Sequence, residues 1–350
     1  MGMKADSGRR DEQSPGKPIN IALQGGGSHG AFSWGVLDAL LEDGRLDIAA
    51  ISGTSAGAMN AVALADGWSR GGRDGARERL ESFWRAVGSV GRFSPVQRMP
   101  WDVLWGNWSV ENSPGFQWFD AVSRAISPYV ANPFGSNPLR DVVKRQIDFE
   151  RVHSASGPMV FISATNVETG QLRVFEKREV TLDAVMASAC LPQLFKAVEI
   201  DGVPYWDGGY GGNPALYPFF YASPVEDVLL VQINPIVRRE IPVMARDILN
   251  RVNEITFNSS LLRELRAISF VTRLIDDGKL DANEYMRVRM HRISADECCE
   301  PLSASSKMNA DWEFLTHLRD QGRSATATWL AESYEAIGER DTLDLARELA

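Results

Sequence analysis

The sequence predicts an α/β protein in which a mainly parallel sheet is flanked by helices. Two short apolar stretches, INIALQ from residue 19 and LDIAAIS from residue 46, have the length and composition of buried strands. Each is followed by a stretch with helical spacing of its apolar or small residues, and Gly44 is positioned to end the first helix. Alternating strands and helices at this short spacing give parallel strands with helices packed on the sheet.

Further strands and helices continue the pattern to about residue 235. A strand pair is expected around a turn at Thr169–Gly170, and another around a turn at Asp201–Gly202. Between the pairs, TLDAVMASAC reads as a helix that stops before Pro192. The apolar run DVLLVQINP, from residue 227, is expected to be one more buried strand.

The chain divides into a leader, a main domain and an extension. Residues 1–17 are polar and are expected to be a disordered leader, and residues 18–235 form the main domain. Residues 84–134 form an insertion rich in tryptophan, proline and glycine, containing Trp84, Trp101, Trp105, Trp108 and Trp118. Its simplest interpretation is an irregular insertion with its own aromatic packing. The alternative is a lid or a lipid-facing surface, because aromatic rings combine an apolar body with a polar edge.

Residues 236–350 are expected to form a mainly helical extension packed on the main domain. One face of a long helix is marked by apolar residues, and Gly278 is expected to end it. These residues are Ile248, Val252, Ile255, Leu262, Leu265, Ile268 and Ile275. A second helix carries Trp312, Leu315 and Leu318 and is expected to end at Gly322.

Composition and charge exclude several classes of function. The 350-residue chain has a formal charge of −9 and no run of Lys and Arg, which argues against a nucleic-acid surface. No apolar run reaches the roughly 18 residues of a transmembrane helix, and the first residues lack the apolar core of a secretory signal. The three cysteines, of which two are adjacent, suggest reduced thiols in a cytoplasmic protein.

A glycine-rich loop follows the first predicted strand. Gly25, Gly27 and Gly30 satisfy the G-x-G-x-x-G pattern of dinucleotide-binding proteins. That site needs an acid at the end of the second strand, whereas Asp47 lies at its start. A phosphate-binding Walker loop is also excluded, because no Gly-Lys-Ser/Thr follows. Bare backbone N–H groups at a helix N-terminus can equally bind the oxyanion of an acyl-transfer reaction.

Ser55 lies between Gly53 and Gly57 in a G-x-S-x-G pattern, directly after the second strand and before a helix. This is the context in which such a serine projects from a sharp turn at the carboxyl edge of a sheet and acts as a nucleophile. The alternative is a purely structural role, in which Ser55 belongs to a tight turn packed on the sheet. A serine needs a base to take its proton, and none of the four histidines has a convincing position for that role.

A carboxylate is the better candidate for the base. Asp207 ends a predicted strand and is followed by Gly208 and Gly209, which would let a second backbone segment approach it. A plain Asp-Gly turn is the competing explanation. A metal site is a further alternative, formed by His291, Cys298, Cys299 and His317, but adjacent cysteines lack the usual ligand spacing.

The ordered set GGGSHG, GTSAG and DGG resembles the patatin-like phospholipases over roughly residues 18–215. The resemblance implies a three-layer patatin-like fold and a Ser-Asp dyad without histidine, in which Ser55 is the nucleophile and Asp207 the base. It also implies an oxyanion hole formed by the N–H groups of Gly26, Gly27 and Ser28. The remaining motif glycines would be Gly25, Gly30, Gly53, Gly57, Gly208 and Gly209.

The implied activity is hydrolysis of a lipid or ester substrate through an acyl-enzyme, with no metal and no cofactor. The expected location is cytoplasmic, with peripheral contact to a membrane surface; the oligomeric state is not indicated. Two residues depart from the family pattern, because Gln24 replaces the usual Asp and His29 replaces the usual Arg or Lys. A dinucleotide-binding oxidoreductase and a non-catalytic lipid-binding protein of the same fold are the alternatives.

Overall fold

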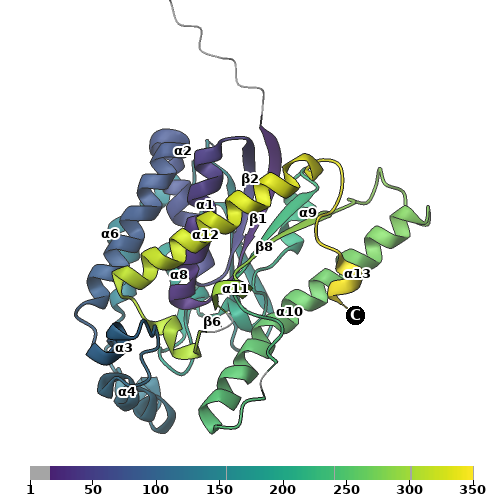
Figure 1. Ribbon diagram of the computed structural model, residues 1–350. Helices are drawn as coiled ribbons and strands as arrows, with labels where there is room; N and C mark the ends of the chain where they lie inside the picture. The colour runs from purple at the N-terminus through teal and green to yellow at the C-terminus, as the bar shows by residue number, and fades with distance from the viewer. Residues whose placement is uncertain (1–15, 155, 240, 300–301, 350) are drawn as a thin grey trace, which may run out of the picture.

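A computed structural model describes residues 16–154, 156–239, 241–299 and 302–349. Apart from its last two residues, the expected leader lies outside the described residues. The described chain forms a central sheet covered by helices on both faces (Figure 1). The predicted α/β class with a mainly parallel sheet is therefore confirmed.

The sheet has eight strands among the described residues, in the order β5-β6-β3-β2-β1-β7-β8, and β4 pairs with β3. The five strands from β3 to β8 along this order are parallel to one another, whereas β4, β6 and β5 pair antiparallel. The strands are β1 (Lys17–Leu23), β2 (Leu46–Gly53), β3 (Met159–Asn166), β4 (Leu172–Glu176), β5 (Val198–Ile200), β6 (Val203–Asp207), β7 (Asp227–Gln232) and β8 (Arg289–Ser294). Both predicted turns have the expected left-handed residues, at Gly170 and at Asp201–Gly202.

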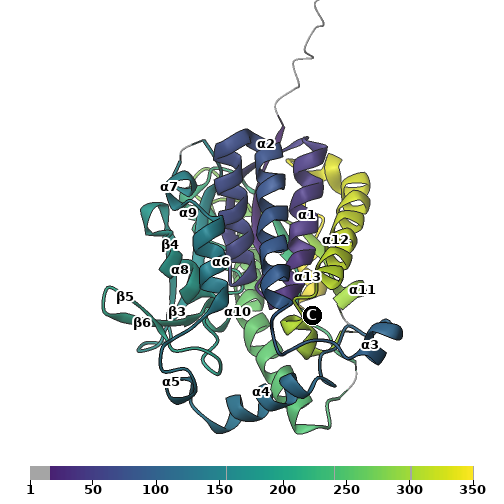
Figure 2. The same ribbon diagram turned by 90° about the vertical axis from the view of Figure 1, so that its left-hand side faces the viewer.

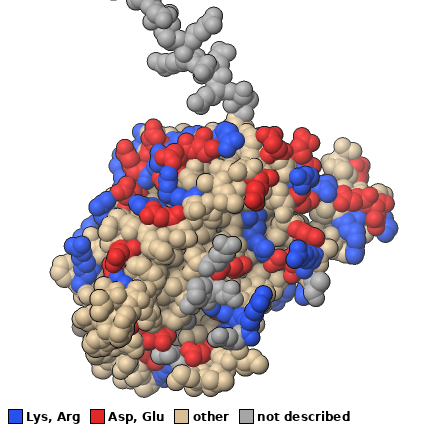
Figure 3. Space-filling view, in the orientation of Figure 1, with Lys and Arg blue, Asp and Glu red and all other residues tan. Residues whose placement is uncertain are grey.

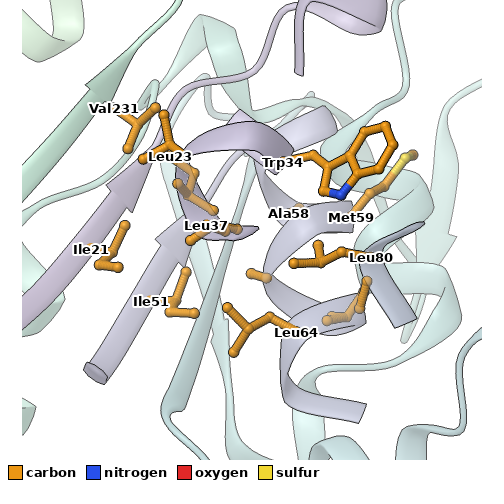
Figure 4. Close-up of a cluster of buried hydrophobic side chains, with 14 of the residues drawn as sticks. Ile21, Leu23, Trp34, Leu37, Ile51, Ala58, Met59, Leu64, Leu80 and Val231 are labelled. Carbon is orange, nitrogen blue, oxygen red and sulfur yellow. The ribbon is translucent and has the colours of Figure 1, made fainter. Parts of the chain in front are cut away.

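Two apolar layers enclose the sheet because its strands alternate in the direction of their side chains. On one face, Ile21, Leu23 and Ile51 pack against α1 (Gly30–Asp43) and α2 (Ala56–Gly91), as Figure 4 shows. On the other face, Ala22 and Ala50 pack with side chains of α9 (Tyr217–Ala222) and α10 (Ala245–Asp276). Figure 2 shows α1, α2 and α12 (Trp312–Ser333) side by side on the first face.

The other helices are shorter. They are α3 (Pro100–Leu104), α4 (Pro114–Ala125), α5 (Pro128–Ala131), α6 (Pro138–Gln146), α7 (Phe149–Val152), α8 (Leu182–Ser188), α11 (Asp296–Cys299) and α13 (Leu345–Glu348). Single 3₁₀ turns are η1 (Gly27–His29), η2 (Lys177–Glu179), η3 (Gly208–Tyr210), η4 (Ala304–Met308) and η5 (Tyr334–Ala336).

The aromatic insertion begins later than the sequence predicts. Trp84 belongs to α2, which continues to Gly91 after a kink at Gly71 and Gly72, and its ring is buried against Trp34. The kink keeps the second half of α2 packed on the core instead of ending the helix. The irregular part therefore follows Gly91 and contains α3, α4 and α5.

The extension differs from expectation in three respects. Gly322 does not end α12 but lies inside it, where any side chain would overlap the carbonyl of Phe32 in α1. The extension also supplies β8, which the sequence did not reveal. Finally, α10 buries Leu265, Ile268 and Ile275 as predicted, but Ile248, Val252 and Ile255 are about half exposed.

Candidate active site

The glycine loop connects β1 to α1 at the carboxyl edge of the sheet. Its first residue is held from both sides, because Gly25 N–H donates to Asn213 Oδ1 (2.7 Å) and its carbonyl accepts from Asn234 Nδ2 (2.6 Å). Among the described residues, the N–H groups of Gly26, Gly27 and Ser28 have no acceptor. Three consecutive N–H groups at the start of a helix are thus available to a negatively charged oxygen.

Ser55 occupies the turn between β2 and α2 in a strained conformation. Its φ of 54° and ψ of −117° lie outside the regions that a side chain normally allows. The flanking glycines are required by space, because a side chain at Gly57 would overlap the carbonyl of Leu23, and one at Gly53 would overlap the backbone of Gly57. The N–H of Ser55 donates to the buried Ser188 Oγ at 2.8 Å. The structure therefore has the geometry expected of a nucleophile turn.

Asp207 is buried at the end of β6, with 2% of its surface exposed. Its backbone N–H donates to the carbonyl of Cys190, and its carboxylate accepts from the N–H of Gly209 (2.7 Å). Burial raises the pKa of Asp207 to about 7, although hydrogen bonds from Gly209 and from the Ser55 side chain oppose this rise. The carboxyl group therefore holds its proton to a higher pH than a solvent-exposed aspartate does.

The three predicted motifs meet at one point. The Ser55 side chain lies close enough to Asp207 to lower the pKa of its carboxyl group, and a Cβ added to Gly25 would lie 2.8 Å from the Cβ of Ser55. Gly30 faces Ala56 at the start of α2, and Gly208 faces Ser163 and Thr54. The motif glycines thus let three backbone segments approach each other closely around one hydroxyl.

Two hydroxyls, one in β2 and one directly after it, fix the segment after Asp207 to the serine turn. Ser52 Oγ donates to the carbonyl of Ala215 (2.6 Å), and Thr54 Oγ1 donates to that of Gly212 (2.7 Å). Asn213, which lies between Gly212 and Ala215, also holds Gly25. One loop, residues 208–215, therefore ties the serine turn to the glycine loop.

Gln24, which replaces the usual Asp, is a buried connector. Its Oε1 accepts from the N–H groups of Ile233 and Asn234 (both 2.9 Å), while its Nε2 donates to the Asn213 carbonyl and to Asn258 Oδ1 (both 3.3 Å). An amide can accept and donate at once, whereas a carboxylate can only accept. Glutamine therefore suits this position because its NH₂ group can donate to two acceptors, on Asn213 and Asn258, which come from later parts of the chain.

His29, which replaces the usual Arg or Lys, is buried and neutral. The Ser306 hydroxyl donates to the Ser303 carbonyl (2.7 Å), so its oxygen accepts from His29 Nε2–H (2.7 Å). Burial, together with the cations Lys307 and Arg238, holds the pKa of His29 well below its ordinary value. His29 therefore supports the loop without offering a positive charge to a ligand.

Sequence reasoning missed the packing of η4 on the glycine loop. The carbonyl of Lys307 occupies the space where a side chain at Gly27 would point, and Gly27 has a φ of 59°. Lys307 Nζ donates to Asn234 Oδ1 (2.9 Å), and Asn234 in turn holds Gly25. Only the serines and lysine of this segment could have suggested a polar contact, and such residues are common on any surface.

The alternative metal site is not assembled. His291 lies on β8, where its Nε2 contacts Asp227 and its Nδ1 contacts Thr342 (both 2.9 Å), and His317 stacks on Trp108. In the parts of the chain that the structure describes, no group of three or more His, Cys, Asp or Glu side chains is arranged for a metal ion. Nor does any helix there combine the length and apolar character needed to cross a bilayer.

The sequence model of the patatin-like phospholipase family matches residues 21–222, more than half of the chain. No curated protein matches the sequence. Among solved structures, VipD from Legionella pneumophila is similar with a TM-score of 0.36 and 15% identity, over 87% of this chain and 67% of that one. The type III effector protein ExoU is similar with a TM-score of 0.34 and 16% identity, over 91% of this chain and 54% of that one. The structure of a complex of ExoU with SpcU from Pseudomonas aeruginosa is similar with a TM-score of 0.29 and 17% identity, over 96% of this chain and 66% of that one. The chain thus spans about half to two thirds of those chains.

Proposed function

Because the chain belongs to the patatin-like phospholipase family, we propose that it is a carboxylic ester hydrolase that cleaves lipid esters with a Ser55–Asp207 dyad. The observation that carries this proposal is a strained serine beside a buried carboxyl group, whose pKa the serine side chain lowers. Strain at a single non-glycine residue is retained where the surrounding structure enforces it, and such residues cluster at active sites.

In the proposed reaction, Asp207 accepts the proton of Ser55 as the serine oxygen attacks the ester carbonyl. The oxygen–carbon bond to Ser55 forms, the alcohol leaves with the proton, and water then releases the acid and restores the serine. A carboxylate with its ordinary pKa is a weak base for this purpose. The pKa of about 7 at Asp207 brings it closer to the value that suits a general base at neutral pH.

The developing oxyanion would be bound by the N–H groups of Gly26, Gly27 and Ser28. Their lack of acceptors among the described residues supports this role. The N-terminus of α1 adds partial positive charge in the same direction. Such donors contribute most where they are fixed before the reaction begins, and the bonds to Asn213 and Asn234 hold Gly25 at the start of this loop.

The proposed setting is a cytoplasmic protein that meets its lipid substrate at a membrane surface. The three cysteines are free thiols, which suits a reducing compartment. We also propose that residues 18–235 form the catalytic domain and that residues 236–350 form an extension that completes the sheet with β8 and supports the glycine loop through η4.

The test is a fluorophosphonate probe together with a panel of p-nitrophenyl esters and phospholipids of different acyl length. Wild-type protein should be labelled and should turn over at least one ester. Ser55→Ala should lose both properties, and Asp207→Asn should lose turnover, while both keep their fold by circular dichroism. Ser33→Ala, which removes another buried hydroxyl, is the matched control. Labelling of the Ser55 variant would show that another residue is the reactive nucleophile, and no turnover of any ester would favour a non-catalytic protein of this fold.

A further inference from the structure

We infer that two segments far apart in the sequence, residues 93–134 and 237–255, form one docking surface for a lipid bilayer. We call them the docking segments. The inference rests on the proposed function, because it concerns how a lipid substrate reaches Ser55.

Exposed large apolar side chains are concentrated in the docking segments. Of the 24 such side chains in the described part of the molecule, 18 lie in these two segments. Phe93, Leu104, Trp105 and Phe134 are each more than three-quarters exposed in the first segment, as are Ile241 and Val243 in the second. Single exposed apolar residues need no explanation, but a concentration of this kind marks an interaction site.

The second segment contains a regular apolar face. Ile248, Val252 and Ile255 follow the helical spacing of i, i+4 and i+7 in α10, yet each is about half exposed. Farther along the same helix, Leu265 and Ile268 are buried against the sheet. The first turns of α10 thus extend beyond the core with an apolar face that no other described part of the chain covers.

The docking segments lie at the same end of the molecule as the candidate site. In Figures 1 and 2 the carboxyl ends of β1 and β2, α4 and the beginning of α10 are all at the lower end. Contacts connect each segment with the site. Phe257 of α10 packs on Tyr210 (ring centroids 5.0 Å apart) and against Gly209, two residues after Asp207.

The first segment is connected to the site through the glycine loop. Trp108 packs on Phe314 (5.1 Å between ring centroids), and Phe314 packs on His29 of the glycine loop (6.2 Å). Its other end is fixed near β5, where the Tyr129 hydroxyl accepts from the Ala197 N–H (3.3 Å). The apolar surface therefore flanks the serine on two sides, so a bilayer bound there would bring its esters close to the site.

The charge of the docking segments suits a membrane surface. The first segment has two Lys or Arg residues and three Asp or Glu residues, and the second has four Lys or Arg residues and three Asp or Glu residues. Together the two segments are formally neutral, whereas the whole chain has a formal charge of −9. Figure 3 shows the lower-left surface, where α3 and α4 of the first segment lie, as largely free of Lys, Arg, Asp and Glu. The acidic surplus of the chain therefore lies outside the docking segments.

The chemistry of the exposed side chains favours a bilayer over a second protein. Trp101, Trp105 and Trp118 are all exposed in the first segment, and tryptophan is enriched where hydrocarbon meets lipid headgroups. The apolar side chains project from short helices and loops. This arrangement suits insertion to a shallow depth without a complementary rigid partner.

The experiment measures binding of the Ser55→Ala protein to vesicles of phosphatidylcholine with one-fifth phosphatidylglycerol, by flotation and by tryptophan fluorescence. Using this inactive variant separates docking from catalysis. Two double variants remove exposed apolar side chains, Leu104→Ser with Trp105→Ser and Ile241→Ser with Val243→Ser. Each should lower the partition coefficient at least tenfold, because each removes two side chains that would be buried in lipid. Tyr221→Ser with Phe270→Ser, exposed apolar residues outside the docking segments, is the matched control and should bind as before.

The same changes in the otherwise wild-type chain should leave hydrolysis of a soluble short-chain ester unchanged but lower hydrolysis of vesicle lipid. Unaltered vesicle binding of both double variants would overturn the inference. So would a dimer in solution that these variants dissociate, since the surface would then join two copies. Vesicle binding without any esterase activity would refute the proposed function while leaving the docking surface supported.

Discussion

The hydroxyl of Ser188 accepts a hydrogen bond from the backbone N–H of Ser55 at 2.8 Å. Ser188 is fully buried at the end of α8, so this bond connects the strained turn to a separate helix. A residue with a φ of 54° costs on the order of 1–3 kcal/mol and persists only where its surroundings enforce it. Ser188 is one of the groups that enforce it.

Replacing Ser188 should therefore affect the turn more than the fold. Ser188→Ala leaves the N–H of Ser55 without its acceptor, which should cost about 1–3 kcal/mol of stability and lower kcat about tenfold by loosening the nucleophile. Steady-state kinetics and urea unfolding would measure the two effects. Ser33→Ala removes a buried hydroxyl that has no partner among the described residues, and it should change kcat little. Equal kinetic losses in both variants would contradict the role given to Ser188.

The pKa of Asp207 predicts how hydrolysis depends on pH. The base must be ionised to accept the serine proton, and burial raises its pKa to about 7. Activity should thus be low at pH 5, half-maximal near pH 7 and constant above pH 8. The measurement is kcat/KM for an uncharged ester between pH 5 and 9. A half-maximal point near pH 4 would show that the carboxylate is not desolvated in solution.

The same carboxyl group predicts a linked effect on stability. Its pKa is higher in the folded chain than the ordinary value of 3.8, so the folded state binds more protons between about pH 4 and 7. Stability is therefore lost as the pH rises through this window. Asp207→Asn should abolish turnover yet raise stability at pH 8, with an upper bound of roughly 4 kcal/mol for a rise from 3.8 to about 7. Urea titrations at pH 4 and pH 8 should show this gain disappearing at the lower pH; a variant that is less stable at pH 8 would contradict the prediction.

Close packing at Gly25 predicts a steric effect that is specific to the site. An added Cβ would lie 2.8 Å from both the Ser55 Cβ and the Thr54 carbonyl oxygen, neither of which can move freely. Gly25→Ala should lower kcat by about 10²–10³ by displacing the oxyanion donors. Gly71→Ala is the control, because nothing lies within 4 Å of its added Cβ. Comparable activity in the two variants would show that the glycine loop can move away from Ser55 without loss.

The sequence predicted well where spacing alone determines the outcome. The strands, their two turns and the order of the three motifs depend on local patterns, and the motifs meet because the carboxyl ends of parallel strands share one edge of the sheet. The failures concern contacts between distant segments. Gly322 resembles a helix stop but is required by the close approach of α12 to α1. Ile248 and Val252 follow a core-like spacing, yet each is about half exposed in the described chain.

The hydrogen-bond partners around the glycine loop could not be predicted from the sequence either. His29 and Gln24 could be recognised as departures from the family pattern, but their partners Ser306, Asn234 and Asn258 come from more than 200 residues away. No local pattern encodes such a contact. The polar network behind the loop therefore had to be found in the structure.

That network predicts a pH-dependent cost for returning a carboxyl group to position 24. Gln24→Glu keeps the shape and the acceptor for Ile233 and Asn234, but its second oxygen would face the Asn213 carbonyl and Asn258 Oδ1, which now receive hydrogen bonds. An ionised carboxyl group there is buried against acceptors, so its pKa should rise above its unfolded value of about 4.3. The variant should lose about 2–4 kcal/mol at pH 8.

The loss should shrink as the pH falls toward 5, because the protonated carboxyl group can again donate, and the folded state then binds more protons than the unfolded state. Urea unfolding at pH 5 and pH 8 measures the difference. Gln171→Glu, at an exposed position, should change stability by less than about 0.5 kcal/mol at either pH. A pH-independent effect at position 24 would mean that the amide of Gln24 contributes only its shape and that Asn213 holds the glycine loop without it.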